Sequence, residues 1–139
     1  MKATIIPCAA ALVLAGLLVA GCGSNDGPTV PTNPVLVTET FTGRLAQGEA
    51  GIHQIVTQQF GTTTITVVSL EPNNTIIIGI GIGTPDGEDC LLQAQNDVVT
   101  QGNILPTNTD IGAFCVAILD VGNITAEQPI DYILDVEHP

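Results

Sequence analysis

The sequence feature that most constrains the fold is the alternation of isoleucine with glycine in residues 75–83, which read Thr-Ile-Ile-Ile-Gly-Ile-Gly-Ile-Gly. A period of two residues is typical of a β-strand, because successive side chains point to opposite faces of a sheet. The glycines on one face indicate a bend or the close approach of another backbone. The opposite face carries Ile76, Ile78, Ile80 and Ile82.

Other segments rich in Ile, Val and Thr follow, separated by clusters of turn-forming residues such as Glu71-Pro72-Asn73-Asn74 and Pro85-Asp86-Gly87-Glu88. From residue 35 on, the sequence carries no convincing helical period. The expected strands span residues 35–41, 51–57, 62–70, 75–83, 90–94, 98–105, 113–119 and 130–136. Seven or eight short strands predict an all-β domain over residues 35–139, an antiparallel β-sandwich. Since aromatic residues are few, branched aliphatic side chains must form its core.

Residues 1–21 form a separate segment, in which Lys2 precedes an apolar stretch over residues 3–21. This layout is typical of a cleaved secretory signal helix with small residues at the cut. The motif Val19-Ala20-Gly21-Cys22 resembles a bacterial lipobox, whose cysteine sulfur receives diacylglycerol and whose chain is cut after the residue before it. The alternative is a retained transmembrane helix, because about 19 apolar residues just span a bilayer.

The lipobox resemblance implies a lipoprotein of the bacterial cell envelope, held to its membrane through Cys22. Gly23, in place of the Asp that retains enterobacterial lipoproteins in the inner membrane, favours the outer membrane. Residues 22–34 then comprise the lipidated cysteine and a flexible tether, since three prolines and small polar residues favour extended chain. At about 3.1 Å per residue, the tether can reach roughly 35 Å.

Besides Cys22, signal cleavage leaves two cysteines, Cys90 and Cys115. Outside the cytoplasm an isolated pair predicts a disulfide, which would stabilise the fold by about 3–4 kcal/mol through loop closure. A zinc site that adds His53 and His138 is the alternative. These four residues lack the closely paired spacings of structural zinc sites.

The charge of the mature chain limits its partners. After cleavage Arg44 is the only base, against 14 Asp and Glu residues. Binding of nucleic acid depends on Lys and Arg side chains that displace counterions. Nucleic acid, nucleotide phosphates and anionic headgroups are therefore poor partners, and the acidic surface is typical of a soluble exported domain.

Side chains for catalysis are scarce. Ser69 lies in a predicted strand without the Gly-x-Ser-x-Gly turn that exposes a nucleophile, and Ser24 lies in the tether. A Ser69–His53 pair is conceivable, although a histidine within a strand is more often structural. Spacing alone does not exclude a carboxylate pair for glycoside hydrolysis. We expect no enzymatic activity and no cofactor, and an unrecognised hydrolase is the third hypothesis.

Calcium binding is the most specific chemistry that the sequence offers. Asp86, Glu88 and Asp89 cluster in one turn, and carboxylate oxygens suit calcium. Because the spacing differs from an EF-hand, a solvated acidic turn is the competing interpretation; Asp120 with Asn123 is a second candidate. The alternative function is thus a calcium-dependent ligand- or carbohydrate-binding module. Exposed aromatic residues commonly bind sugars, but Phe114 and Tyr132 fall on apolar strand faces, where we expect them in the core.

The order of strand patterns from Phe41 to the end resembles the bacterial pre-peptidase C-terminal domain, a jelly-roll-like β-sandwich appended to secreted peptidases and other exported proteins. The matching segments are residues 41–45, 53–56, 64–67, 112–116 and 131–136. The family's middle strand often carries an acidic pair, which residues 75–83 lack. Members of the family are generally accessory modules, so the resemblance implies a non-catalytic interaction or structural role with a protein or cell-surface partner.

Overall fold

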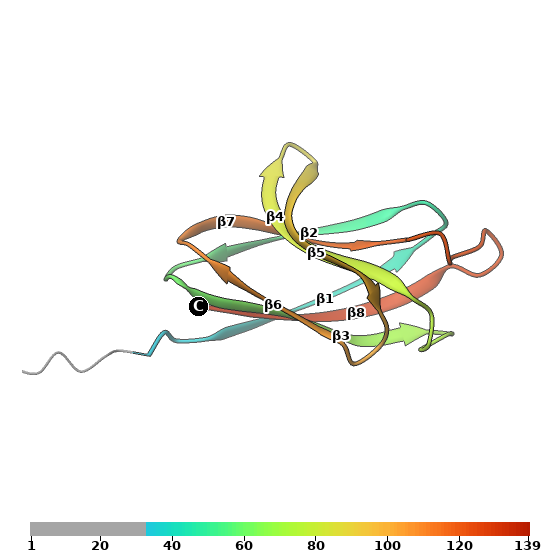
Figure 1. Cartoon of the computed structure of the whole chain (residues 1–139), viewed down its shortest axis with the longest axis horizontal. Coiled ribbons are helices and arrows are strands. Elements are labelled where there is room, and N and C mark those ends of the chain that lie inside the picture. Colours follow the sequence, from blue (N-terminus) through green and yellow to red (C-terminus); the bar gives the residue numbers. More distant parts are fainter. Residues whose placement is uncertain (1–32) are drawn as a thin grey trace, which may run out of the picture. The chain divides into compact units, whose positions relative to one another are not determined.

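The computed structural model describes residues 33–139, and the predicted signal, Cys22 and most of the predicted tether lie outside these residues. The described part consists of strands and loops, and none of its segments is a helix long and apolar enough to cross a membrane. Figure 1 shows two layers of strands. The strands are β1 (Val37–Leu45), β2 (Ala50–Thr57), β3 (Gly61–Glu71), β4 (Ile78–Asp86), β5 (Asp89–Val99), β6 (Ile104–Thr109), β7 (Gly112–Leu119) and β8 (Ile130–His138).

The strand order is that of a jelly roll. One sheet has the order β1-β8-β3-β6 and the other β2-β7-β4-β5, and all the pairings are antiparallel. Each strand of the first half pairs with its counterpart from the second half: β1 with β8, β2 with β7, β3 with β6 and β4 with β5. Such pairing arises when one long hairpin folds over into two packed sheets. The predicted antiparallel β-sandwich is confirmed.

Aliphatic side chains fill the space between the sheets, as the composition predicts. Ile78, Ile80 and Ile82 of β4 are almost completely buried, and they meet Ile65 and Leu134 from the other sheet in one hydrophobic core. Burying each of these side chains contributes about 1.5–3 kcal/mol. Tyr132 belongs to this core and Phe114 packs against it, as expected from their strand faces.

The glycines of β4 admit the backbone of β5. A Cβ atom at Gly83 would overlap the carbonyl group of Leu91, and one at Gly81 would lie 3.0 Å from the carbonyl oxygen of Ala94. The pairing register of β4 and β5 shifts beside Gly83, between Ile82 and Gly83. From there the tip of the hairpin projects from the sandwich (Figure 1). The glycine face therefore marks both a close approach and a bend.

Several strand predictions differ from the structure in their bounds. The expected strands at residues 75–83 and 90–94 are observed as Ile78–Asp86 and Asp89–Val99, respectively. Residues 98–105 do not form one strand: β5 ends at Val99, and a turn precedes β6. In this turn the Oδ1 atom of Asn103 accepts a hydrogen bond from the backbone N–H of Thr100 at 2.8 Å, and Gly102 has a φ of 87°. The first strand begins and ends later than residues 35–41, because β1 continues past Gly43 and pairs with β8 as far as Leu45.

Candidate functional site

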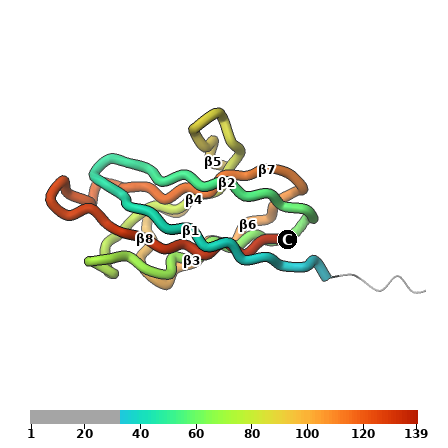
Figure 2. The backbone as a smooth tube through the Cα atoms, turned by 180° about the vertical axis from the view of Figure 1, so that it is seen from behind, coloured from blue at the N-terminus to red at the C-terminus, as the bar shows by residue number. Residues whose placement is uncertain are grey.

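The two ends of the sandwich differ in chemistry. One end gathers the start of the described chain, the β2–β3 and β6–β7 connections and Pro139 (Figure 2). A Cβ atom at Gly61 would lie 3.0 Å from Cγ of Pro139 and 3.8 Å from Cγ of Pro34. The backbone N–H of Gln58 donates to the carbonyl oxygen of Pro139 at 3.0 Å. Segments that are remote in sequence are therefore tied together here.

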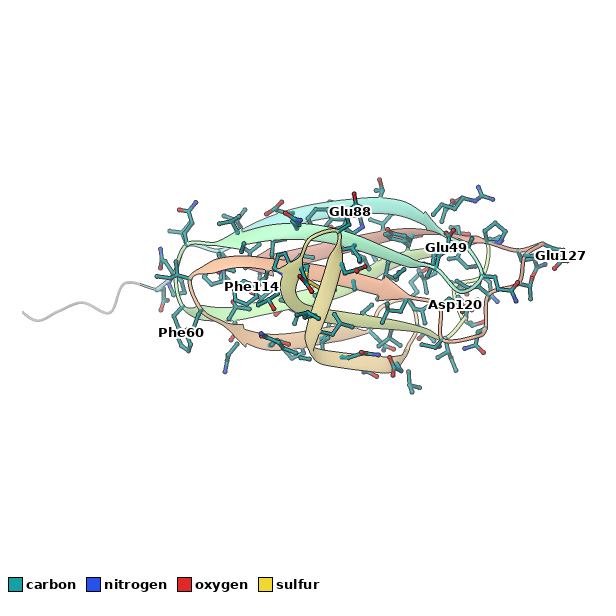
Figure 3. All side chains as sticks on the ribbon, turned by 90° about the horizontal axis from the view of Figure 1, so that it is seen from above. Glu49, Phe60, Glu88, Phe114, Asp120 and Glu127 are labelled. Carbon is teal, nitrogen blue, oxygen red and sulfur yellow. A yellow bond between two sulfur atoms is a disulfide. The ribbon has the colours of Figure 1, made fainter. Side chains whose placement is uncertain are left out.

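Exposed apolar side chains cover this end. Val35, Phe60 and Ile111 are 73%, 66% and 71% exposed, respectively. We define the apolar end as Val35, Leu36, Val37, Val56, Phe60 and Ile111, all of which are exposed. In Figure 3, Phe60 lies at this end, while Glu49, Asp120 and Glu127 lie at the opposite one. Phe60 and these three acids, which define the acidic end, therefore lie at opposite ends of the domain, while other exposed apolar side chains, such as Leu91 and Val98, lie outside the apolar end.

A hollow of about 450 Å³ opens beside the apolar end, where Val35, Val37 and Val56 contribute to its lining. His138 also lines it, and the Nε2 atom of this buried side chain lies 2.9 Å from the Oε1 atom of Glu39. The Nδ1 atom of His138 is buried without a hydrogen-bond partner. The hollow combines these valine side chains with the His138–Glu39 pair and with three glutamines, Gln54, Gln58 and Gln59.

Asp120 organises the loops at the acidic end. Its carboxylate accepts hydrogen bonds from four backbone N–H groups, those of Gly48 (2.8 Å), Gly122 (2.8 Å), Asn123 (3.0 Å) and Ile124 (3.1 Å). Desolvation raises the pKa of Asp120, but the four N–H groups outweigh this effect and hold the pKa below its usual value. Both predicted ligands of the second calcium candidate thus take part in loop structure, since the side chain of Asn123 donates to the carbonyl oxygen of Ile77 at 3.0 Å.

A second hollow, of about 310 Å³, lies between the β3–β4 and β7–β8 loops. Its polar lining is neutral and comes from Asn73, Thr75, Asn123, Thr125 and Gln128. Amide and hydroxyl groups both donate and accept hydrogen bonds. The hollow therefore suits an uncharged polar ligand better than an ion.

His53 joins the two sheets. Its ring stacks on Phe41 with the ring centroids 4.6 Å apart, and its Nε2 atom lies 2.9 Å from the hydroxyl oxygen of Tyr132. Burial lowers the pKa of His53 and raises that of Tyr132. Within residues 33–139 no hydrogen bond connects His53 to Ser69, so the structure does not bring the conceivable Ser–His pair together.

The predicted disulfide is confirmed. Cys90 of β5 and Cys115 of β7 are linked, with their Cα atoms 5.8 Å apart. Because β4 lies between β5 and β7 in the sheet, the bond ties the projecting hairpin back across β4. It also leaves neither thiolate free for the zinc site that was the alternative.

The acidic turn lies at the tip of the β4–β5 hairpin. Asp86 and Asp89 face each other across Gly87 and Glu88, and all three predicted calcium ligands are exposed. Over the described range 33–139, no three His, Cys, Asp or Glu side chains form a group that could hold a metal ion. The calcium site at Asp86, Glu88 and Asp89 stays a prediction.

Comparison with known proteins adds no relative: no protein-family model matches the chain, and no curated protein matches it significantly. The apolar end is the feature that the strand pattern did not predict. The available signal was the position of Phe60 and Ile111, which are large apolar residues in connections between strands. Such residues are unusual where turns expose their side chains to water.

Proposed function

We propose that the protein is a non-catalytic interaction or structural module that a lipid on Cys22 holds at the bacterial cell envelope. The observation that carries this proposal is the Cys90–Cys115 disulfide. Disulfides persist in oxidising compartments outside the cytoplasm, which is where a secretory signal would send the chain. The disulfide and the lipobox resemblance are independent features that agree on the compartment.

The described domain is consistent with an anchored module. It begins shortly after the predicted tether, and its eight strands form a disulfide-linked sandwich with a continuous aliphatic core. The resemblance to the pre-peptidase C-terminal domain also favours an accessory role. With Arg44 as its single base, the domain would engage a protein or another cell-surface partner rather than nucleic acid.

Fatty-acid labelling tests the anchor. A bacterial host that expresses the full chain and is fed radioactive palmitate should label the wild type, and Cys22→Ser should abolish the label. Cys8→Ser is the matched control, because Cys8 lies within the predicted signal and should leave labelling unchanged. Retention of label in Cys22→Ser would contradict the proposal.

A second candidate function is binding of a neutral polar ligand such as a carbohydrate, and the neutral hollow between the β3–β4 and β7–β8 loops favours it. Neutral oligosaccharides should then raise the thermal midpoint, and Gln128→Ala should abolish this shift. Gln59→Ala at the opposite end is the control. Repeating the titration with millimolar calcium, and with Asp86→Asn and Glu88→Gln, determines whether the hairpin acids contribute. An unchanged midpoint in every case rules against this candidate.

A further inference from the structure

We propose that the apolar end rests on the lipid surface to which the protein is anchored, so that the acidic end points away from the membrane. This inference rests on the proposed lipid anchor at Cys22. It assigns a binding surface to the domain and fixes which of its loops remain free for partners.

The first argument is the exposure of the apolar end. Its six side chains come from three segments that the fold brings together, and they remain exposed to solvent. Contiguous apolar surface on a small soluble domain marks a contact site with another apolar surface. Phe60 is the only aromatic ring among the described residues that is predominantly exposed. It occupies this end, where a lipid interface would bury it.

The second argument is the position of the apolar end along the chain. Val35 and Leu36 directly follow the predicted tether of residues 23–34, so among the described residues they are the exposed apolar side chains nearest to Cys22 in sequence. The predicted tether would hold this end within roughly 35 Å of the bilayer and would give it a high effective concentration there. A weak apolar contact then suffices to keep the apolar end on the membrane. The lipid surface is therefore favoured as its binding partner over a protein that must diffuse to the site.

The third argument is charge. Glu49, Asp120 and Glu127 lie at the opposite end, and so does Arg44, which is the only base among the described residues and pairs with Asp131 at 3.6 Å. Three acids lie near the apolar end: Glu39, which is paired with His138; Glu137, which is exposed opposite Thr38; and Asp110, which precedes Ile111. Facing the bilayer with the apolar end therefore puts Glu49, Asp120 and Glu127 on the side away from anionic headgroups, whose repulsion decays over a Debye length of about 8 Å at physiological salt.

Depth-dependent quenching tests the orientation. Gln59→Cys, next to Phe60, and Glu127→Cys, at the acidic end, are each labelled with a fluorophore in the full-length lipidated protein. The label should react only with the new cysteine, because Cys22 would carry lipid and Cys90 is bonded to Cys115. The proteins are reconstituted into phosphatidylcholine vesicles that contain lipids with a nitroxide quencher near the headgroup. We expect strong quenching at position 59 and little at position 127.

A double variant and a change of lipid composition test whether apolar contact causes the quenching at position 59. Phe60→Ser combined with Ile111→Ser should reduce quenching at position 59 to the level at position 127, while the thermal midpoint stays unchanged because both side chains are exposed. Partial replacement by phosphatidylglycerol should weaken the quenching, and added salt should restore it.

The outcomes separate this inference from the anchor itself. The mass of the reconstituted protein shows whether Cys22 is lipidated, and an unlipidated cysteine would overturn the anchor and the orientation together. Equal quenching at the two positions in a lipidated protein would overturn the orientation alone. The orientation would also be overturned if the label at position 59 were shielded from solvent in native membranes but not in vesicles of pure lipid, since that result would identify a protein as the occupant.

Discussion

The Nε2 atom of His53 lies 2.9 Å from the hydroxyl oxygen of Tyr132, and this hydrogen bond joins the two sheets of the sandwich. Tyr132→Phe should therefore lower the free energy of unfolding by about 1–2 kcal/mol, because it leaves a half-buried imidazole nitrogen without its partner. Urea denaturation measures the loss. Thr62→Val is the control, since it removes an exposed hydrogen bond to Asn108 and should cost less than about 0.5 kcal/mol. Equal losses in the two variants would contradict a special role for the pair.

Gly51 makes room for the ring of Tyr132. A Cβ atom at position 51 would overlap the Tyr132 hydroxyl and lie 3.0 Å from its Cζ atom. Gly51→Ala should cost about 1–3 kcal/mol by overpacking, as measured by urea denaturation. In the Tyr132→Phe background the cost should be smaller, because the nearest clashing atom is gone. Identical costs in both backgrounds would show that the Tyr132 hydroxyl is not the reason for the glycine.

Burial lowers the pKa of His53 below its ordinary value of 6.5. As the pH falls through 6.5, the unfolded state therefore takes up a proton before the folded state does, and the free energy of unfolding decreases. The contribution of neutral His53 to the free energy of unfolding is therefore fully present above pH 6.5, and it is lost as the pH falls towards the lowered pKa of the folded state. Urea melts between about pH 5 and pH 8 should show this slope, and His53→Gln should reduce it. The same slope in both proteins would contradict the prediction.

Asp120 connects the β1–β2 and β7–β8 loops through backbone hydrogen bonds. Asp120→Ala should destabilise the fold by about 2–3 kcal/mol, since it leaves several N–H groups unpaired. Asp120→Asn should cost less, because its Oδ1 can keep three of the four bonds and only the contact with Gly48 is lost. Thermal and urea denaturation measure the loss of stability in each of the two variants.

Two further results check the Asp120 prediction. Because the pKa of Asp120 is lowered, its stabilising effect should be present above 3.8 and disappear as the pH falls below that value. Asp131→Asn, which alters only an exposed ion pair with Arg44, should change stability by less than about 0.5 kcal/mol. An Asp120→Ala variant as stable as Asp131→Asn would refute the role of the carboxylate.

The sequence predicted the strands and the core because both depend on local alternation. The two-residue period alone places Ile78, Ile80 and Ile82 on the buried face. Cys90 and Cys115 could be paired because the predicted domain over residues 35–139 contains no other cysteine. The turn at Gly102 and Asn103 was missed, because apolar residues on both sides of it look like one strand. The His53–Tyr132 bond and the apolar end depend on which strands and loops become neighbours. Only the jelly-roll topology determines which of these segments meet, although Phe60 and Ile111 already stand out in the sequence as large apolar residues in connections between strands.

The most direct test of the central proposal is the intact mass of the protein extracted with detergent from bacterial membranes. We predict a chain that begins at Cys22 and carries the additional mass of a diacylglycerol on that residue. A chain that retains Met1, or one that begins at Cys22 without lipid, would contradict the proposal.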